Sequence, residues 1–415
     1  MLKINGRAYR KPTSPVVVIC YDGCDPSYLA DAFARRLSPT LARMAEGGYY
    51  ASGLAAMPSF TNPNNISIVC GAPPSVHGIS GNYWFDRETG AEVMMTDEVT
   101  LEAPTILATM AAAGVRVAAV TAKDKLRKAL ATGLNGSGPR GIAFSAQKAY
   151  ECTVETNGIS AEEAMGGATL PDQYSAELSL FVLDAGVRLL ESDAADLIYL
   201  SLSDFVQHAY APGAAESDDF IRQVDARVAR LIELGATVGV VADHGMTDLS
   251  LADGTPNILY VAELLDTRFG VGRTRVICPI TDPFVRHHGA LGGFVRIHVL
   301  DDLPHEEVRD FASAIPGIHM ALLRDEACRL FDLPPAREGD VTLVAAKGVA
   351  LGVRRSWHNI DELAGARLRS HGSLAERDVP FIVSKPIRPE FLEQYGEKAP
   401  YNFDVFHFVL NGTVA

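Results

Sequence analysis

The sequence predicts an α/β protein: a doubly wound, mostly parallel sheet flanked by helices, with a smaller α+β cap lobe inserted into it. Three observations lead to this prediction. Short apolar runs end abruptly at polar residues, helical patterns separate these runs, and the pattern changes between residues 257 and 366. We therefore expect a main domain at residues 1–256 and 367–415 and an inserted lobe at 257–366.

Four apolar runs are expected to form the central strands. The first follows Pro15 and ends at Asp22-Gly23, and the others span 115–121, 196–202 and 237–242. A continuous apolar run rich in β-branched residues is typical of a strand buried on both faces, as in parallel sheets. Helical patterns at 103–113 and 218–234 precede the second and fourth runs, and a further strand at 380–384 returns to the main sheet.

The inserted lobe is predicted from shorter elements. Strand-like runs at 275–280, 294–300 and 341–346 alternate with a helix-like segment at 305–314. This mixture is typical of an α+β arrangement. We expect the lobe to cover the functional site.

Composition narrows the class of partner. The 415 residues carry a formal net charge of −14, which argues against a nucleic-acid polymer or an anionic membrane as partner. A small anionic substrate remains compatible, because a local metal site can outweigh the distant field. No apolar run reaches transmembrane length, and the six cysteines are scattered, which favours free thiols. These features predict a cytoplasmic enzyme.

Metal-ligand residue types follow three of the predicted strands. Asp22, Asp204, Asp243 and His244 all stand at or just beyond the carboxyl end of an apolar run. In doubly wound sheets the ligand site lies beyond these ends. The functional site is therefore expected at this edge.

These residues suggest two metal sites. Asp204 and His208 are four residues apart, so on a helical turn they share one side, and His371 could complete that site. Asp22 would form the second site together with Asp243 and His244. Mixed nitrogen and oxygen ligation suits Zn²⁺ best, with Mn²⁺ or Fe as alternatives. Taken singly, each residue could instead be a helix cap, a turn or a surface histidine, and only the joint pattern favours metal binding.

Thr61 is the candidate nucleophile. It precedes Asn62-Pro63, and Pro63 suits the first turn of a helix. At a helix N-terminus, the backbone N–H groups and the dipole favour a bound phosphoryl oxygen. Ser59 is the rival nucleophile in the same loop, and Thr61 could alternatively serve only as a helix cap.

The order of these motifs resembles the alkaline phosphatase superfamily. It is most similar to the branch that contains nucleotide pyrophosphatase/phosphodiesterases and phosphonoacetate hydrolases. The motifs that carry the resemblance are Asp22-Gly23, Phe60-Thr61-Asn62-Pro63-Asn64, Gly71 with His77-Gly78-Ile79, Asp204-x-x-x-His208, Asp243-His244-Gly245 and His371-Gly372. The resemblance covers the main domain and implies an alkaline phosphatase-like fold.

The resemblance also implies roles for single residues. One zinc would be held by Asp204, His208 and His371, and the other by Asp22, Asp243 and His244. Thr61 would attack phosphorus to form a phosphothreonine, which water at the metal site then hydrolyses. Asn82 matches the position of an asparagine that steadies a phosphoryl oxygen, whereas His77 is expected to be structural.

Lys123 and Lys125 bear on the substrate. In an extended backbone their spacing would point both the same way. They resemble the segment that binds the substrate carboxylate in phosphonoacetate hydrolases. Ammonium groups there would stabilise the enolate that forms as the carbon–phosphorus bond breaks. The alternative is a solvated run of charges, and Arg286, His287 and His288 in the lobe are further candidates for which a surface role is favoured.

The expected function is thus hydrolysis of phosphonoacetate, a small anionic organophosphorus compound, to acetate and phosphate. The alternative within the same superfamily is a nucleotide phosphodiesterase or pyrophosphatase. A metal-binding relative without catalysis is a third hypothesis, against which the intact ligand set and Thr61 argue. A homodimer fits enzymes of this kind.

Overall fold

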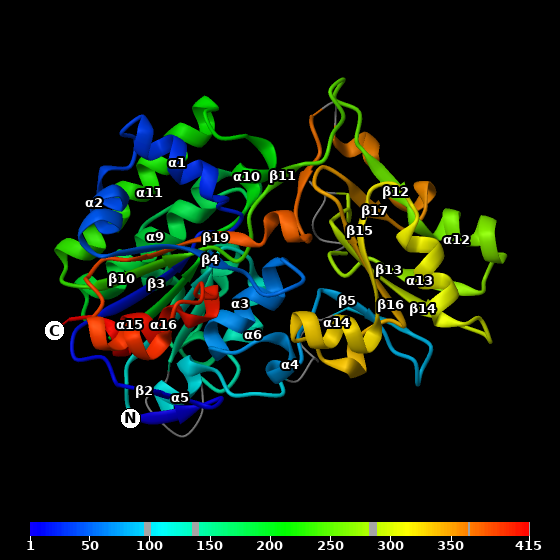
Figure 1. The fold of residues 1–415 in the computed structure, drawn as a ribbon. Helices are drawn as coiled ribbons and strands as arrows, with labels where there is room; N and C mark the ends of the chain where they lie inside the picture. The colour runs from blue at the N-terminus through cyan, green and yellow to red at the C-terminus, as the bar shows by residue number, and fades with distance from the viewer. Residues whose placement is uncertain (95–100, 135–140, 282–288, 364–365, 415) are drawn as a thin grey trace.

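The computed structural model describes residues 1–94, 101–134, 141–281, 289–363 and 366–414. The central strands are β3 (Val16–Cys20), β4 (Tyr49–Leu54), β7 (Val117–Thr121), β8 (Ile142–Ser145), β9 (Leu197–Ser201), β10 (Thr237–Val241) and β19 (Asp378–Val383). They form one seven-stranded sheet in the order β4-β19-β10-β3-β9-β7-β8 (Figure 1). The strands from β10 to β8 run parallel, while β19 runs antiparallel to both β10 and β4. The predicted mostly parallel sheet is confirmed.

Helices cover both faces of this sheet (Figure 1). One face packs against α1 (Pro26–Ala34), α2 (Pro39–Gly47), α9 (Ala176–Glu191) and α11 (Ala215–Glu233). The other packs against α3 (Thr61–Cys70), α5 (Ile106–Ala112), α6 (Asp124–Leu130), α15 (Pro389–Tyr395) and α16 (Val405–His407). Shorter helices are α4 (Pro74–His77), α7 (Val154–Asn157), α8 (Ala161–Met165) and α10 (Phe205–Ala209). The sheet is therefore doubly wound, as predicted.

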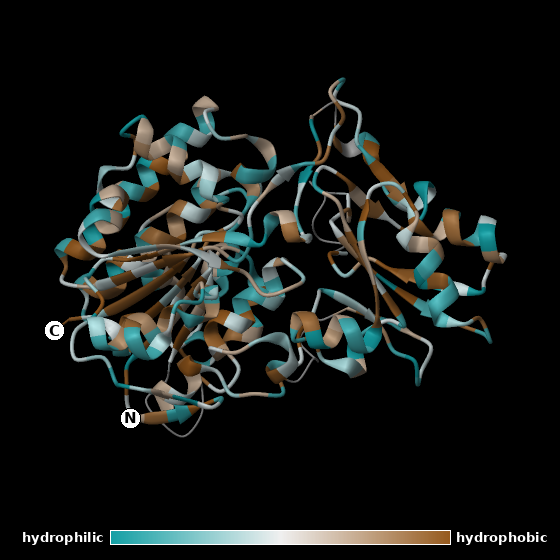
Figure 2. Cartoon of the chain, viewed as in Figure 1, coloured by the Kyte–Doolittle hydropathy of each residue, from teal (hydrophilic) through white to brown (hydrophobic). Residues whose placement is uncertain are grey.

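Strand β3 shows why its run is continuously apolar. Val17 and Ile19 pack in the core of one face, whereas Val16, Val18 and Cys20 pack in the core of the other. Successive side chains of a strand point to opposite faces, so a strand covered twice needs apolar residues at every position. The brown central strands in Figure 2 show the same pattern.

Some element ends differ from the sequence predictions. The helix predicted to begin at residue 103 begins at Ile106, because the side chain of Thr105 accepts a hydrogen bond from the Ala108 N–H and caps it. Helix α11 begins at Ala215, earlier than predicted, directly after a turn at Gly213. Edge strands β4 and β8 were not predicted.

A second sheet lies beside the first (Figure 1). Its antiparallel strands are β13 (Thr274–Ile277), β14 (Phe294–Val299), β16 (Val341–Ala345) and β15 (Ile318–Leu323), in that order. The helices α12 (Val261–Phe269), α13 (His305–Ser313) and α14 (Arg324–Phe331) belong to the same part of the chain. This agrees with the α+β character expected for residues 257–366, while the domain boundaries themselves stay a prediction.

Short strand pairs complete the fold. They are β1 (Leu2–Ile4) with β2 (Arg7–Tyr9), β5 (Tyr83–Phe85) with β6 (Glu92–Met94), β11 (Thr247–Asp248) with β18 (Arg369–Ser370), and β12 (Ile258–Tyr260) with β17 (Ala350–Gly352). The pair β11–β18 joins the segment that leaves the main sheet to the segment that returns to it. That pairing brings residue 371 back to the site.

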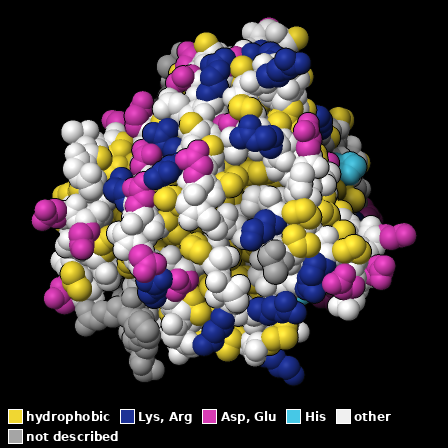
Figure 3. Space-filling model, turned by 90° about the vertical axis from the view of Figure 1, so that its left-hand side faces the viewer, with side chains coloured by type: hydrophobic (Ala, Val, Ile, Leu, Met, Phe, Trp, Pro, Cys, Tyr) yellow, Lys and Arg dark blue, Asp and Glu magenta, His cyan; other side chains and the backbone are white. Residues whose placement is uncertain are grey.

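The cysteines, the surface charges and the helices can be compared with what the composition predicted. All six cysteines are free thiols, as predicted, and five are buried. Acidic and basic side chains are interspersed on the face shown in Figure 3. Among the described helices, none is both long and apolar enough to cross a membrane.

Candidate active site

Three aspartates meet at one edge of the main sheet. Strand β3 lies between β9 and β10, and its last residue, Cys20, pairs with Ser201 on one side and Val241 on the other. The strands are parallel and in step, so their carboxyl ends meet at the same edge. The segments that follow them carry Asp22, Asp204 and Asp243, all of which are buried.

The first ligand group contains Asp22, Asp243 and His244, and we call it triad one. His244 Nε2 lies 3.3 Å from Asp22 Oδ1 and 3.7 Å from Asp243 Oδ2. The Gly23 N–H donates to Asp243 Oδ1 at 3.2 Å. Asp22 is not a helix cap, because Asp25 caps α1 by accepting from the Ser27 N–H.

The second group contains Asp204, His208 and His371, and we call it triad two. Asp204 stands at the start of α10, and His208 Nε2 lies 2.9 Å from its Oδ2. His371 comes from the segment after β18, and its Nε2 lies 3.9 Å from the same oxygen. Within each triad, one ligand atom from each residue lies within 4.8 Å of the others. The structure thus brings together the same two groups that the sequence suggested.

All three histidines use the same ring nitrogen to hold the backbone. His208 Nδ1 donates to the Arg369 carbonyl at 2.6 Å, His244 Nδ1 to that of Gly245 at 2.8 Å, and His371 Nδ1 to that of Ser59 at 2.8 Å. A carbonyl oxygen can only accept, so each Nδ1 carries the hydrogen. Each Nε2 therefore faces the site, and once it carries no proton its lone pair can bind a metal, as is typical of metal-binding histidines.

The pKa values show that the site demands positive charge. Burial raises the pKa of Asp22 well above its usual range, and Asp204 and Asp243 raise it further. Burial would lower the pKa of His244, but attraction to Asp243 and Asp22 outweighs it and raises that pKa to about 10. His371 behaves oppositely, since burial and its positions beside His244 and His208 hold its pKa well below the usual value.

This donor set fits divalent cations. Clustered buried carboxylates repel one another, and a proton on His244 offsets only part of their charge. The mixture of imidazole nitrogens and carboxylate oxygens in each triad is a ligand type used by zinc and by neighbouring transition metals. The triads lie side by side, because the rings of His244 and His371 stack with centroids 3.5 Å apart.

Thr61 lies next to triad one. It is the first residue of α3, and its Oγ1 lies 3.2 Å from His244 Nε2. The preceding Phe60 occupies the N-cap position, so the Thr61 hydroxyl is not the cap. Ser59, the rival nucleophile, is fully buried and donates its hydroxyl hydrogen to the Ser373 carbonyl at 2.8 Å. The geometry favours Thr61 over Ser59.

Asn65 joins Thr61 to triad one and was missed by the sequence reasoning. Its Nδ2 donates to the Thr61 carbonyl at 3.0 Å and to Asp243 Oδ2 at 3.1 Å. The Tyr199 hydroxyl donates to its Oδ1 at 2.7 Å. Its spacing of four residues from Thr61, one helical turn, was the signal that could have identified it.

A cavity of about 60 Å³ connects these groups to the remaining candidates. Its lining comprises Asp22, Phe60, Thr61, Asn62, Asn82, Ala122, Lys123, Lys125, Leu126, Ser201, Leu202, Asp204, Ile280 and His371. All the predicted substrate-binding residues are therefore on its wall. The cavity suits a small ligand rather than a polymer.

The two lysines reach the cavity by a different route from the one expected. Helix α6 begins at Asp124, so Lys123 is its N-cap and Lys125 lies in its first turn, and the backbone is not extended through both. Both side chains are nevertheless half-buried and line the cavity. Lys123 Nζ lies 3.5 Å from Asp204 Oδ1. The alternative interpretation, in which the two lysines belong to a fully solvated run of charges, does not agree with these positions.

Asn82 faces the cavity from the segment after α4. It is 8% exposed, and its Nδ2 donates to the Ile280 carbonyl at 3.2 Å. His77, expected to be structural, is buried in the same region with its Nε2 2.8 Å from Ser67 Oγ. Arg286, His287 and His288 lie outside the described residues.

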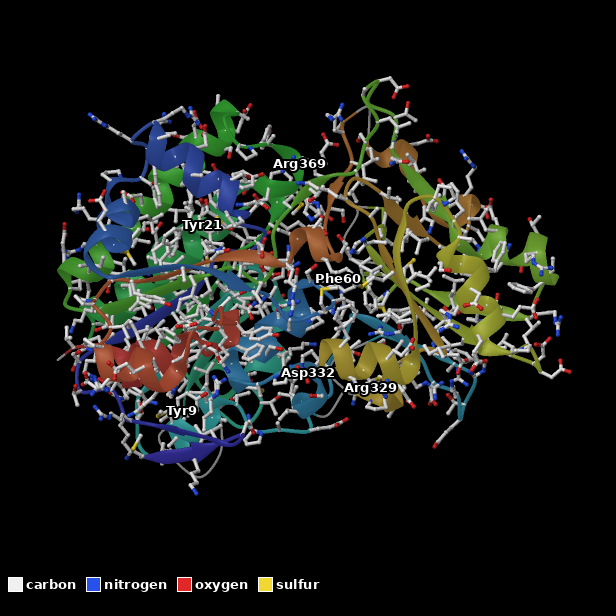
Figure 4. The ribbon with its side chains drawn as sticks, in the orientation of Figure 1. Tyr9, Tyr21, Phe60, Arg329, Asp332 and Arg369 are labelled. Carbon is white, nitrogen blue, oxygen red and sulfur yellow. The ribbon has the colours of Figure 1, made fainter. Side chains whose placement is uncertain are left out.

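The lobe also contacts the loop that precedes Thr61. The ring of Phe60 packs in the core of the second sheet, edge-on to Phe294 and to His371. Figure 4 shows Phe60 between the two sheets and Arg369 above it, where its carbonyl accepts from His208. The residue before Thr61 is thus held from the lobe side.

Comparisons with known proteins agree with this geometry. The family model described as type I phosphodiesterase / nucleotide pyrophosphatase matches residues 16–373. An uncharacterised pyrophosphatase/phosphodiesterase of Schizosaccharomyces pombe is 25% identical over 246 residues, which cover 57% of this chain and 46% of that protein. The alkaline phosphatase PafA of Elizabethkingia meningoseptica is 32% identical over 89 residues, covering 21% and 16%. The chain therefore spans less than half the length of these curated relatives.

Solved structures of two proteins are reported that are similar over nearly the whole chain. Phosphonoacetate hydrolase from Sinorhizobium meliloti, in complex with phosphonoformate or with phosphonoacetate, is 44% identical with a TM-score of 0.93. Each match covers 99% of this chain and 98% of that one. Murine ectonucleotide pyrophosphatase/phosphodiesterase 5, as an inactive variant with AMP, is 18% identical with a TM-score of 0.63, covering 97% and 96%. This second likeness supports the alkaline phosphatase-like fold alone.

Proposed function

The chain belongs to the type I phosphodiesterase / nucleotide pyrophosphatase family, and we propose that it hydrolyses phosphonoacetate to acetate and phosphate. One observation carries the proposal. One small cavity is lined by Thr61, by members of both aspartate–histidine triads and by the two half-buried lysines, Lys123 and Lys125. The likeness to phosphonoacetate hydrolase over the whole chain supports the same substrate.

The proposed reaction begins at Thr61. Its hydroxyl proton passes to water as Oγ1 forms a bond to phosphorus, while the carbon–phosphorus bond breaks and its electron pair passes to the methylene carbon. The N-terminal N–H groups of α3 and the Asn82 side chain would hold the phosphoryl oxygens. Divalent cations bound by the triads would polarise the phosphoryl group and lower the pKa of the attacking hydroxyl.

The leaving group explains the lysines. A carbanion is a poor leaving group unless its charge spreads into an adjacent carboxylate as an enolate. Ammonium groups of Lys123 and Lys125 on that carboxylate would stabilise the enolate more than the substrate, and so accelerate cleavage. A proton from water then gives acetate. A second water hydrolyses the phosphothreonine, which releases phosphate and restores Thr61.

We propose zinc for both metal sites, with manganese or iron as alternatives. The ligands of each site support zinc, since both mix imidazole and carboxylate. We also propose a cytoplasmic homodimer. The six free cysteines support a reducing compartment, and the homodimer rests on the resemblance to this kind of enzyme. Elemental analysis and analytical ultracentrifugation would test the metal and the oligomeric state.

A nucleotide phosphodiesterase is the second candidate, which the family match supports. A nucleotide needs a slot in which its base can stack. Among the described cavity residues the only phenylalanine, tyrosine or tryptophan is Phe60, and its ring is fully buried in the lobe core. The cavity therefore supports the smaller substrate better.

Phosphate release separates these functions. We expect release from phosphonoacetate, weak or no turnover of a nucleotide diester, and no cleavage of methylphosphonate, which lacks the carboxylate. A 4-nitrophenyl phosphate ester reports whether the site is catalytic at all. Faster turnover of the nucleotide diester would favour the phosphodiesterase, and no turnover of any substrate by metal-loaded protein would favour a non-catalytic relative.

A further inference from the structure

Asn82 stands in a segment that depends on the lobe for its position. The Asn82 N–H donates to the Pro279 carbonyl at 2.7 Å, and its side chain donates to that of Ile280. A Cβ on the preceding Gly81 would lie 2.7 Å from Pro279 Cβ, so this close approach requires glycine. Both carbonyls belong to the segment that follows β13, on the edge of the second sheet.

A buried ion pair holds the other end of this segment. Arg296 on β14 and Glu338, just before β16, are 0% and 2% exposed. The guanidinium binds the carboxylate through two contacts, Nε to Oε2 at 2.6 Å and Nη2 to Oε1 at 2.5 Å. Burying two charges costs desolvation free energy, so a fully buried ion pair need not stabilise the fold. Its role therefore depends on what else the pair contacts.

Ser80 fits between the two charges. Arg296 Nη2 donates to the Ser80 carbonyl at 2.8 Å and to its Oγ at 3.0 Å. The Ser80 hydroxyl in turn donates to Glu338 Oε1 at 2.9 Å. The backbone and the side chain of Ser80 are thus both fixed, two residues before Asn82, by groups of the second sheet.

We infer that Arg296 and Glu338 are positioning residues that act through Ser80 to hold Asn82 at the cavity. The inference rests on the proposed function, because it assigns Asn82 to a phosphoryl oxygen. It goes further in making the lobe sheet, rather than the main sheet, responsible for the placement of that group. A small displacement of a group that contacts the reacting phosphoryl lowers the rate strongly.

A double-mutant cycle tests this coupling. Ser80→Ala removes only the hydroxyl, and Glu338→Gln keeps the shape while removing the charge. Each should lower kcat roughly ten- to hundredfold on both phosphonoacetate and 4-nitrophenyl phosphate, because both substrates carry the phosphoryl group. In the Asn82→Ala background the same changes should have almost no further effect, because the group that they position is gone.

A matched control separates positioning from stability. Arg324, the first residue of α14, pairs with the buried Asp340 just before β16, and none of its hydrogen bonds or ion pairs among the described residues is to Ser80. Arg324→Ala should lower the melting temperature while leaving kcat within about twofold. Metal content and melting temperature are measured for every variant, and Ser80→Ala alone suffices if Glu338→Gln does not fold.

The outcomes are distinct. Equal losses with and without Asn82, or full activity of Ser80→Ala and Glu338→Gln where Asn82→Ala is impaired, would overturn the inference. An unimpaired Asn82→Ala would overturn it as well. If the wild type cleaves 4-nitrophenyl phosphate but not phosphonoacetate, the proposed substrate fails, and the cycle on the ester still decides the inference.

Discussion

The two triads are built from the same residue types but by different means. Triad one comes from the ends of β3 and β10, strands that pair directly in the main sheet. In triad two, Asp204 and His208 come from β9 and α10, whereas His371 arrives only after the chain has passed through the lobe. Triad one is therefore a product of one sheet edge, and triad two depends on the junction between the two sheets.

The surroundings of the triads also differ. Thr61 Oγ1 lies against His244 of triad one, whereas Lys123 Nζ lies against Asp204 of triad two. We therefore propose that the two triads act on different parts of the substrate. In the proposed reaction, triad one would lie beside the bond that forms at Thr61, and triad two would lie beside Lys123, which would bind the carboxylate.

Metal removal should have the largest effect. Chelation is expected to abolish turnover and to lower the melting temperature, because buried carboxylates repel one another without a dication. Asp243→Ala should empty triad one, and His371→Ala should empty triad two. Elemental analysis would measure one remaining metal per chain in each variant. Full activity of protein verified as metal-free would end the two-metal proposal, and loss of both metals from either variant would show that the triads are not independent.

Loss of the nucleophile should follow. Thr61→Ala is expected to lower kcat by several orders of magnitude while both metals stay bound, because covalent catalysis is lost. Thr61→Ser should retain part of the activity. Steady-state kinetics and metal analysis would check this. If Thr61→Ala turned over nearly as fast as wild type, water would be the direct nucleophile and triad one would have lost its assigned role.

The lysines should give a smaller and substrate-dependent effect. A charge-assisted contact to an anion contributes about 1.5–3 kcal/mol, so Lys123→Ala or Lys125→Ala should slow phosphonoacetate cleavage roughly tenfold to hundredfold. A nitrophenyl phosphate ester has no carboxylate, and its rate should change little. Lys128→Ala, an exposed lysine of the same helix, is the control. Equal losses on both substrates would point to a general anion field and would favour the phosphodiesterase.

Acidification should have the smallest effect of these changes, and it should remove metal from triad one before triad two. Without metal, His244 binds a proton up to a pKa of about 10, and burial with neighbouring carboxylates raises the pKa of Asp22. A metal entering triad one must displace these protons, so its affinity rises with pH up to about 10 and falls as the pH drops. His371 in triad two has a pKa well below its usual value and is already neutral at pH 7.

Dialysis between pH 8 and pH 6 followed by metal analysis would measure this difference. We expect the wild-type protein to lose first the metal ion of triad one, which is the ion that Asp243→Ala lacks. Simultaneous loss of both metals would mean that proton competition is shared across the site, as in a single coupled cluster.

The sequence predicted those site residues that directly follow the ends of the central strands. Asp22, Asp204 and Asp243 follow continuous apolar runs, and parallel strands bring such ends together whatever the details of packing. The edge strands β4 and β8 could not be predicted in the same way. Strand β4 alternates between half-buried and exposed residues for most of its length, so no continuous apolar run marks it.

The sequence by itself therefore determined the parallel sheet, the two groups of ligand-type residues and the candidate nucleophile, because period and polarity are local properties. The tertiary structure decided the rest. It buried Ser59 against the Ser373 carbonyl and turned Lys123 and Lys125 toward one cavity at the start of a helix. It also placed Ser80 between Arg296 and Glu338. These contacts join segments that are distant in sequence, and packing selects them only once both sheets have formed.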